Sequence, residues 1–263
     1  MKILVTNDDG INAPGLSVLE NIAHIIAGPN GEVWTVAPSS EQSGVAHCIS
    51  FTKPMLISKI SERKFSVEGS PADCVLAGIY DVMKSNKPDL ILSGVNRGNN
   101  SADNALYSGT IGAAIEGTIH KIRSIAFSQY LGPRNIKNKD PFEAANYYGA
   151  EIIENLLKYN EWGTGNYRVF YNVNFPPVGA NEVLGSKFTP LGFRENSSFS
   201  VEPSLSPGGK RFLWIKGGPQ DIPTKENTDA AVNLNGYISI TPMNTDLTDY
   251  SSLEKLMKKF KTT

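Results

Sequence analysis

Short apolar runs alternate with helix-type patterns in the first part of this chain, and this alternation restricts its possible folds more than any other feature. Apolar runs without polar alternation are typical of strands that are buried on both faces of a sheet. The segment from Leu16 to Ile26 has apolar residues at helical spacing and separates the first two runs. Because a strand, helix, strand unit joins parallel strands, this order predicts an open α/β sheet. The runs lie at Lys2–Thr6, Glu32–Ala37, Asp89–Ser93, Ser124–Gln129 and Tyr167–Asn174.

Further elements are expected between these strands. Met55–Ile60 and Lys64–Val67 resemble two strands joined by a polar turn, and we expect them to form an antiparallel pair off the main sheet. Ser70 as a cap and Pro71 at the first helical position predict a helix that reaches about Met83. Two more helices are expected, at Ile111–His120 and from Asp140 to Tyr159.

The last part of the chain has weaker patterns. Glycine, proline and serine cluster between Gly185 and Pro223, with a strand-like run at Arg211–Ile215. Gly236–Thr241 predicts a strand, and Ser252–Phe260 predicts an amphipathic terminal helix. We therefore expect an α/β domain over residues 1–180. We expect residues 181–263 to form a β-rich extension that makes contacts between subunits.

Composition limits the class of partner. A formal net charge of −1 gives no electrostatic case for binding long nucleic acid, which needs many cationic contacts with phosphates. No apolar run reaches the roughly 18 residues that span a bilayer, and the first strand begins at Lys2, without room for a signal peptide. We therefore expect a cytoplasmic protein without membrane contact. Cys48 and Cys74 give no disulfide framework, and we expect both to be reduced core residues.

Four polar segments stand where an α/β sheet has its ligand site. Three of them follow predicted buried strands, and the fourth opens a predicted helix. In an open α/β sheet, ligands bind beyond the carboxyl ends of the strands. The segments are Asn7–Gly10, Glu41–Gly44, Ser93–Asn96 and Tyr107–Thr110.

The adjacent carboxylates of Asp8 and Asp9 are the strongest candidates for metal ligands. Two neighbouring negative charges repel each other, and a hard cation such as Mg²⁺, Mn²⁺ or Ca²⁺ removes that cost through oxygen ligands. Asn96 adds a neutral oxygen for a metal, or an N–H for a phosphate. The alternatives are that one aspartate caps a turn while the other is solvated, and that residues 93–100 form an ordinary loop with a solvated Arg97.

Ser108, Gly109 and Thr110 stand at the start of a predicted helix. Free N–H groups at a helix N-terminus bind anions, and hydroxyls add donors. The alternative is ordinary capping by Ser108 or Thr110. On its residues alone, Glu41–Gly44 does not differ from a loop.

Several chemistries are excluded by missing motifs. The chain has no Walker A sequence, no G-x-G-x-x-G, no zinc motif and no nucleophile elbow. His24 and His120 fall on predicted helices, where we expect them to be packed or at the surface. An acid and metal site that acts on a phosphate therefore fits the residues best.

These segments resemble those of the family of the stationary-phase survival protein SurE. The members of that family are metal-dependent 5′/3′-nucleotidases. The resemblance covers nearly the whole chain in order. In one departure, Ala102 replaces a glycine of the family pattern and Asp103-Asn104-Ala105 replaces an acidic, acidic, valine run, which leaves the shape of this loop open. The matching segments are Asn7–Gly15, Ala37–Gly44, Gly69–Val75, Pro88–Asn96, Tyr107–Gly117, Asn172–Pro176, Thr228–Ala231, Gly236–Pro242 and Asp246–Asp249.

The resemblance implies a Rossmann-like, three-layer core whose C-terminal β extension is exchanged between subunits of a homodimer or homotetramer. It implies one divalent cation per subunit, Mg²⁺ or Mn²⁺, and the assignment of Ser43 as a ligand rests on the family alone. The expected metal ligands are Asp8, Asp9, Ser43 and Asn96. The expected phosphate contacts are Asn96, Asn100, Ser108, Gly109 and Thr110.

We therefore expect residues 1–180 to form the catalytic domain of a phosphomonoesterase that hydrolyses nucleoside 5′-monophosphates, and 3′-monophosphates as well. Asp8 is the expected catalytic residue. Either Asp8 or a water that it orients helps to position or deprotonate the attacking water. An exopolyphosphatase and a nucleotide-binding regulator without turnover stay open as alternatives. So do the preferred base, the choice between 5′ and 3′ phosphate, the physiological metal and the choice between dimer and tetramer.

Overall fold

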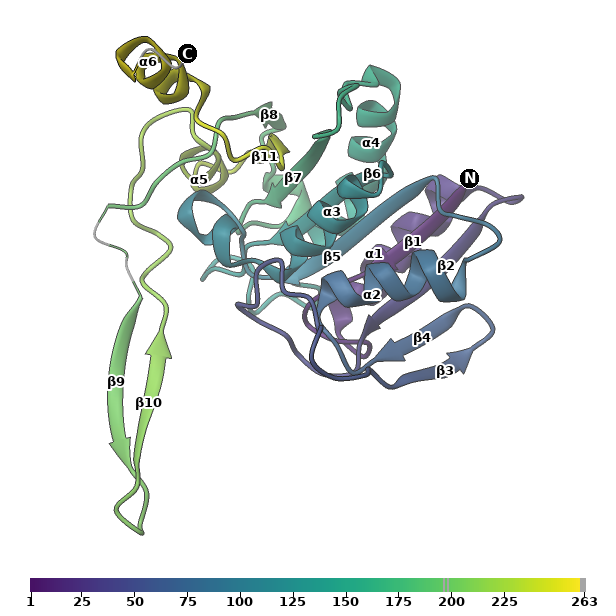
Figure 1. The fold of residues 1–263 in the computed structure, drawn as a ribbon, viewed down its shortest axis with the longest axis horizontal. Coiled ribbons are helices and arrows are strands. Elements are labelled where there is room, and N and C mark those ends of the chain that lie inside the picture. Colours follow the sequence, from purple (N-terminus) through teal and green to yellow (C-terminus); the bar gives the residue numbers. More distant parts are fainter. Residues whose placement is uncertain (196, 198, 261–263) are drawn as a thin grey trace.

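The computed structural model describes residues 1–195, 197 and 199–260, and its centre is one twisted sheet with helices on both faces (Figure 1). The strands are β1 (Lys2–Thr6), β2 (Glu32–Pro38), β3 (Ile57–Ser61), β4 (Lys64–Val67), β5 (Leu90–Arg97), β6 (Arg123–Gln129), β7 (Val169–Phe175), β8 (Ser186–Phe188), β9 (Ser200–Leu205), β10 (Arg211–Lys216) and β11 (Ile238–Asn244). The α-helices are α1 (Pro14–Ala27), α2 (Pro71–Ala77), α3 (Gly109–Ile119), α4 (Glu143–Tyr159), α5 (Asp229–Leu234) and α6 (Tyr250–Phe260). Shorter helical turns lie at Gly78–Val82, Ala102–Tyr107 and Ala180–Glu182.

The sheet is mainly parallel and reverses its direction of growth beside β1. In the described residues its strand order is β3-β4-β2-β1-β5-β6-β7-β11-β8. The chain runs outward from β1 to β2, then crosses back to place β5 on the other side of β1. β6 and β7 continue in parallel, whereas β11 is antiparallel to β7. This arrangement confirms the predicted α/β fold and puts a topological switch point between β1 and β5, where such sheets bind ligands.

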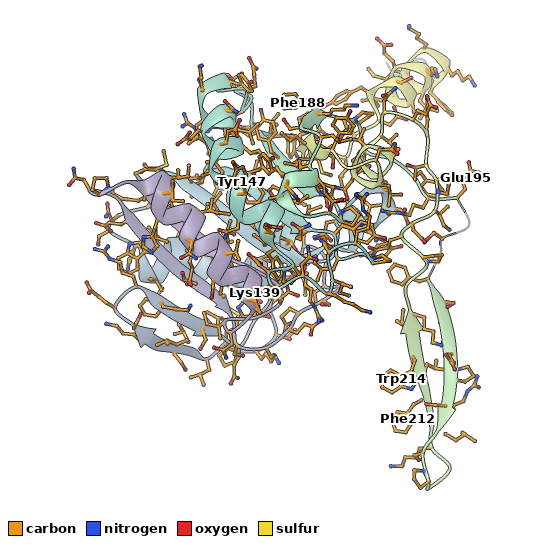
Figure 2. All side chains as sticks on the ribbon, turned by 180° about the vertical axis from the view of Figure 1, so that it is seen from behind. Lys139, Tyr147, Phe188, Glu195, Phe212 and Trp214 are labelled. Carbon is orange, nitrogen blue, oxygen red and sulfur yellow. The ribbon has the colours of Figure 1, made fainter. Side chains whose placement is uncertain are left out.

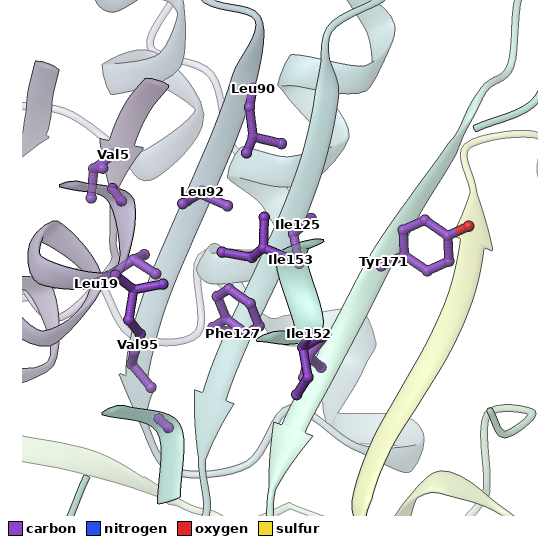
Figure 3. Close-up of a cluster of buried hydrophobic side chains, with 14 of the residues drawn as sticks. Val5, Leu19, Leu90, Leu92, Val95, Ile125, Phe127, Ile152, Ile153 and Tyr171 are labelled. Carbon is purple, nitrogen blue, oxygen red and sulfur yellow. The ribbon is translucent and has the colours of Figure 1, made fainter. Parts of the chain in front are cut away.

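Successive residues of β1 point to opposite faces and so enter different cores. Ile3 and Val5 pack with residues of α1 and α4, and Figure 3 shows part of this cluster. Leu4 packs with residues of α2 on the other face. The close packing also explains a glycine at the start of α1, because a Cβ on Gly15 would lie 2.0 Å from the carbonyl oxygen of Val95 in β5. Helices α1 and α4 therefore form one outer layer, and α2 and α3 form the other.

Two predicted elements and the predicted burial of one cysteine are among the expectations that differ from the structure. β3 and β4 are antiparallel to each other, but β4 also pairs with β2 in parallel, so the pair extends the main sheet and does not leave it. The helix expected to reach Met83 is regular only to Ala77 and continues as a π-helical turn. Cys74 is buried as expected, whereas Cys48 is exposed, because it lies in the loop between β2 and β3.

The residues after 180 take part in both the sheet and a separate hairpin. β8 and β11 belong to the main sheet, and β9 pairs only with β10 in a hairpin that stands away from the body (Figures 1 and 2). β8, β9 and α5 were not predicted, because each is short and lies in a segment rich in glycine, proline and serine. The division at residue 180 stays a prediction. Within the described residues, every helix is too short or too polar to cross a bilayer.

Candidate functional site

The candidate site lies at the switch point between the carboxyl ends of β1 and β5. Thr6 and Ser93 form the last residue pair between these two strands. Asp8 and Asp9 follow β1 after Asn7, and Asn96 lies near the end of β5. The main-chain N–H of Arg97 donates to Oδ2 of Asp9 at 2.9 Å, which ties the two strand ends together. The structure therefore brings three of the four predicted metal ligands to one edge.

A β-bulge places Asn96 at this edge. Ser93 pairs with Ala126 and Asn96 pairs with Ser128, so β5 has one residue more than β6 between these pairs. Gly94 lies in the bulge with φ +130°, and a Cβ there would be 2.2 Å from the carbonyl oxygen of Phe127. Only glycine fits that backbone and that contact. The sequence indicated a strand that ends at Ser93, because a glycine follows the apolar run.

Asp8 is nearly inaccessible, with 4 % of its surface exposed. Its Oδ1 accepts a hydrogen bond of 2.7 Å from the Thr110 hydroxyl, and its carbonyl oxygen accepts one of 2.7 Å from the N–H of Gln42. Burial raises the pKa of Asp8 to about 7; the Thr110 hydrogen bond lowers it, and the charge of Asp9 raises it further. Burial also raises the pKa of Asp9. Burial therefore disfavours the charged form of both carboxyls, although Arg97 lowers the pKa of Asp9, and a divalent cation bound beside them would favour the charged form.

Helix α3 begins against the Asp8 carboxylate. The Ser108 hydroxyl accepts the N–H of Ile111 at 3.1 Å, so Ser108 is the N-cap of α3, as the capping alternative expected. A Cβ on Gly109 would lie 3.2 Å from Oδ2 of Asp8. The absence of a side chain at Gly109 thus leaves the first turn of α3 open toward this carboxylate. The N-terminus of a helix carries partial positive charge and favours an anion there.

Asn100 acts on Asp8 through Thr110. Its Nδ2 donates to the Thr110 hydroxyl at 3.1 Å and to the Ser128 hydroxyl at 2.8 Å, which uses both of its N–H bonds. The Thr110 hydroxyl accepts from Asn100 and donates its own proton to Asp8. Asn100 therefore sets the direction in which Thr110 donates.

Ser43 lies beside the site in an exposed loop. Its hydroxyl donates to Oε1 of Glu41 at 2.7 Å, and the neighbouring Gln42 makes the main-chain contact with Asp8 described above. The same loop continues to His47, whose Nε2 lies 2.6 Å from Oε2 of Glu116 in α3. This contact fastens the loop that carries Ser43 to the helix that faces Asp8.

Glu116 was not singled out by the sequence, although it lies one helical turn from His120. Its carboxylate is 6 % exposed and contacts both His47 and Nε2 of His120, the latter at 2.8 Å. Burial alone would raise the pKa of Glu116, but the hydrogen bonds and charges of the two histidines outweigh it and lower the pKa. The i, i+4 spacing of Glu116 and His120 was a signal for this pair. His120 is thus a packed residue, as expected.

The oxygen atoms at this edge fit a hard divalent cation. In the described part of the chain, hydrogen bonds use Oδ1 of Asp8, Oδ2 of Asp9 and Nδ2 of Asn96, and leave one oxygen of each side chain without such a bond. Two carboxylate oxygens and one amide oxygen are the donors that Mg²⁺ and Mn²⁺ prefer. Among the described residues, no group of three or more His, Cys, Asp or Glu could hold a metal ion.

The pKa of Asp8 gives a prediction for the stability of the metal-free protein. An ordinary aspartate has a pKa of 3.8, and Asp8 in the fold has about 7, so between these values the folded protein binds the extra proton. Stability must therefore fall as the pH rises through this range, by about 4 kcal/mol in total.

Thermal unfolding in EDTA at about pH 5 and about pH 8 measures the larger part of this fall, about 2.6 kcal/mol. We expect Asp8→Asn to remove most of it, because the asparagine stays neutral at both values. Equal pH dependence of the wild type and Asp8→Asn would contradict the assignment of this effect to Asp8.

The sequence analysis also missed the polar residues that support the Asn100 segment. The Asn174 side chain accepts the N–H of Asn100 at 2.7 Å, and the Asn172 side chain donates to the Asn100 carbonyl at 2.8 Å. Both asparagines lie on the same face of β7. Polar residues two apart in an apolar strand were the available signal, since such a pair must find partners when it is buried.

The loop at Ala102 has a definite shape. Ala102 has φ +52°, and its N–H donates to Oδ2 of the buried Asp229 at 2.9 Å. Glycine takes a positive φ without strain, whereas alanine adopts it rarely. The other oxygen of Asp229 accepts the N–H of Gly192 at 2.8 Å. Asp229 therefore joins the loop to the C-terminal extension, and burial raises its pKa.

Comparisons with known proteins agree on one family. The family model described as "Survival protein SurE" matches residues 3–198. The chain is 61 % identical over 256 residues to a protein of Ruegeria pomeroyi named 5′-nucleotidase SurE, covering 97 % of this chain and 98 % of that protein. A Cereibacter sphaeroides protein of the same name is 60 % identical over the same shares. The crystal structure of the SurE protein from Aquifex aeolicus has a TM-score of 0.79 at 36 % identity, over 98 % of this chain and 99 % of that one.

Proposed function

This chain belongs to the SurE family, and from that premise we propose that it is a divalent-metal-dependent 5′-nucleotidase that hydrolyses nucleoside monophosphates to nucleoside and phosphate. Relatives with about three fifths of their residues identical over nearly the full chain carry the name 5′-nucleotidase SurE. The observation that supports the proposal most is the buried Asp8 between Asp9 and the N-terminus of α3. We propose nucleoside 3′-monophosphates as a second substrate class.

In this proposal Asp8, Asp9 and Asn96 hold one Mg²⁺ or Mn²⁺ per subunit, with Ser43 as a further ligand. The bound cation supplies positive charge to the phosphoryl oxygens and lowers the pKa of a water. The free oxygens of Asp8, Asp9 and Asn96 support their assignment. The Ser43 hydroxyl would have to leave its hydrogen bond with Glu41 in order to bind the cation. Ser43 lies next to Gln42, whose main-chain N–H already contacts Asp8.

The protein groups have separate roles in the proposed reaction. Asp8 positions the attacking water and accepts its proton. The first turn of α3 binds the phosphoryl oxygens through its free N–H groups and the hydroxyl of Ser108, while the Thr110 hydroxyl donates to Asp8. Asn100 contributes by orienting Thr110. The glycine at position 109 lets the first turn of α3 lie close to the Asp8 carboxylate.

Phosphate release from a panel of substrates tests this proposal. The panel contains 5′- and 3′-monophosphates of each common base and an inorganic polyphosphate, each with Mn²⁺ or Mg²⁺. We expect the 5′-monophosphates to have the highest kcat/KM. Fast release from polyphosphate with slow release from all monophosphates would replace the proposal by an exopolyphosphatase. Binding of nucleotides without release would replace it by a regulator.

We also propose that the extension joins copies of this chain into a homodimer or homotetramer. The β9–β10 hairpin stands clear of the body, and Phe212 and Trp214 are 53 % and 65 % exposed on it (Figure 2). Helix α6 likewise has no buried residue among those described. Exposed apolar surface of this kind marks a contact with another protein. A mass of one chain in sedimentation at micromolar concentration would contradict the proposal.

We propose the cytoplasm as the location of the enzyme. The two cysteines, Cys48 and Cys74, are free, as is usual for proteins in a reducing compartment. Cell fractionation with antibody detection tests this, and recovery of the protein outside the cytoplasmic fraction would contradict it.

A further inference from the structure

We propose that Arg194 is a positioning residue for the nucleotidase reaction, because its guanidinium fixes the segment that carries Asn100 and so orients Thr110 toward Asp8. Arg194 lies on the connection between β8 and the hairpin, beside Glu195, which Figure 2 labels. The inference rests on the proposed function above. It adds a residue of the C-terminal extension to the groups that determine the rate.

The guanidinium binds the residues on both sides of Asn100. Nη1 of Arg194 donates to the carbonyl oxygen of Ser101 at 2.8 Å. Nη2 donates to the Ser101 hydroxyl at 2.7 Å and to Oδ1 of Asn99 at 3.3 Å. A planar group with several N–H bonds in fixed directions holds such a set of acceptors in one geometry. Asn99 and Ser101 are therefore fixed relative to each other, and Asn100 lies between them.

A chain of hydrogen bonds leads from this segment to the reacting groups. Asn100 donates to Thr110, and Thr110 donates to Asp8. The hydrogen bond from Asn100 fixes the orientation of the Thr110 hydroxyl, and this orientation aims the hydroxyl proton at Asp8. A rotation of the Asn100 segment therefore changes how Thr110 faces Asp8. Small displacements of positioned groups cost rate, and an error of about 1 Å can cost about 100-fold.

The burial of Arg194 shows how firmly this cation is held. It is 3 % exposed, and its nearest carboxylate oxygen, Oδ1 of Asp103, lies 3.7 Å from Nη1. Most of its partners are therefore neutral oxygens, and a buried charge is stable only when such bonds are satisfied. Nε also donates to the carbonyl of Gln220, at 3.3 Å. Gln220 follows β10, so Arg194 joins both ends of the hairpin to the Asn100 segment.

The test compares Arg194→Gln and Arg194→Lys with the wild type, in the full-length protein with saturating Mn²⁺ and a 5′-monophosphate. We expect kcat of Arg194→Gln to fall by about 10- to 100-fold, with a smaller fall for Arg194→Lys, which keeps the charge but not the planar set of donors. The affinity for Mn²⁺ alone should change much less than kcat, because the loop contact at Gln42 and the Asp9 contact at Arg97 do not involve Arg194. The matched control is Arg134→Gln, which removes a guanidinium that pairs with Glu182 at the surface and should leave kcat unchanged.

Two results would overturn the proposal. The first is a folded Arg194→Gln protein with the wild-type kcat. The second is a parallel loss of kcat, Mn²⁺ affinity and thermal stability in both variants, because that pattern indicates a structural role only. If Arg194→Gln does not fold, Ser101→Ala and the double variant with Arg194→Lys decide the question. The proposed contact predicts that their effects on kcat are not additive, and additive effects would overturn it. A wild type that releases phosphate from no nucleotide would instead refute the nucleotidase proposal, and the role of Arg194 in that reaction with it.

Discussion

Replacement of Asp8 by asparagine should lower kcat about 1000-fold or more while the protein stays folded. The fold should survive, because the asparagine oxygen can still accept the hydrogen bond from Thr110. The reaction should not, because the asparagine has no charge for the cation and cannot accept a proton from the water. A 1000-fold loss corresponds to about 4 kcal/mol of transition-state stabilisation. Steady-state kinetics of phosphate release measure the effect.

Asp89→Asn is the matched control for this variant. Asp89 precedes β5 at the opposite edge of the sheet, where its carboxylate accepts the N–H of Lys2 at 2.8 Å. The same loss of one negative charge at that edge should leave kcat close to the wild-type value. A folded Asp8→Asn protein that keeps a near-normal kcat would remove Asp8 from the mechanism.

Removal of the divalent cation should have an effect of similar size. Without the cation, a phosphate dianion would have to approach the carboxylates of Asp8 and Asp9 directly. Like charges in contact repel strongly where water is excluded. Both substrate binding and the chemical step should suffer, so kcat/KM should fall by about 1000-fold or more in EDTA. Addition of excess Mn²⁺ or Mg²⁺ should restore it. Unchanged release in EDTA would show that the reaction does not need the cation.

The sequence predicted the central fold because its signals there are local. Short apolar runs, glycine stops and capping residues locate β1, α1, β2 and β6 almost to the residue, and the parallel order follows from the alternation. The expected site edge follows in turn, because Asp8, Asp9 and Asn96 are placed by the ends of β1 and β5. These features depend on neighbours in the chain, which the sequence displays.

Features that depend on distant neighbours were not predictable in this way. At the bulge, Gly94 comes so close to the Phe127 carbonyl of the next strand that no side chain fits, and nothing near Gly94 in the sequence shows that contact. Arg194 resembles any surface arginine in its sequence context, and only the fold reveals that it is buried against Ser101. The same holds for Glu116, whose partner His47 is 69 residues away. Long-range polar contacts therefore account for most of what the sequence analysis missed at the site.

Stepwise addition of Mn²⁺ to the metal-free protein tests the central claim most directly, with Mn²⁺ binding and phosphate release from a 5′-monophosphate measured in the same samples. A cation held by Asp8, Asp9 and Asn96 predicts that release rises in step with the filling of one site per subunit, and that Asp8→Asn loses both. A rate of phosphate release that is already maximal before Mn²⁺ is added, or that does not rise with Mn²⁺ binding, would contradict this mechanism.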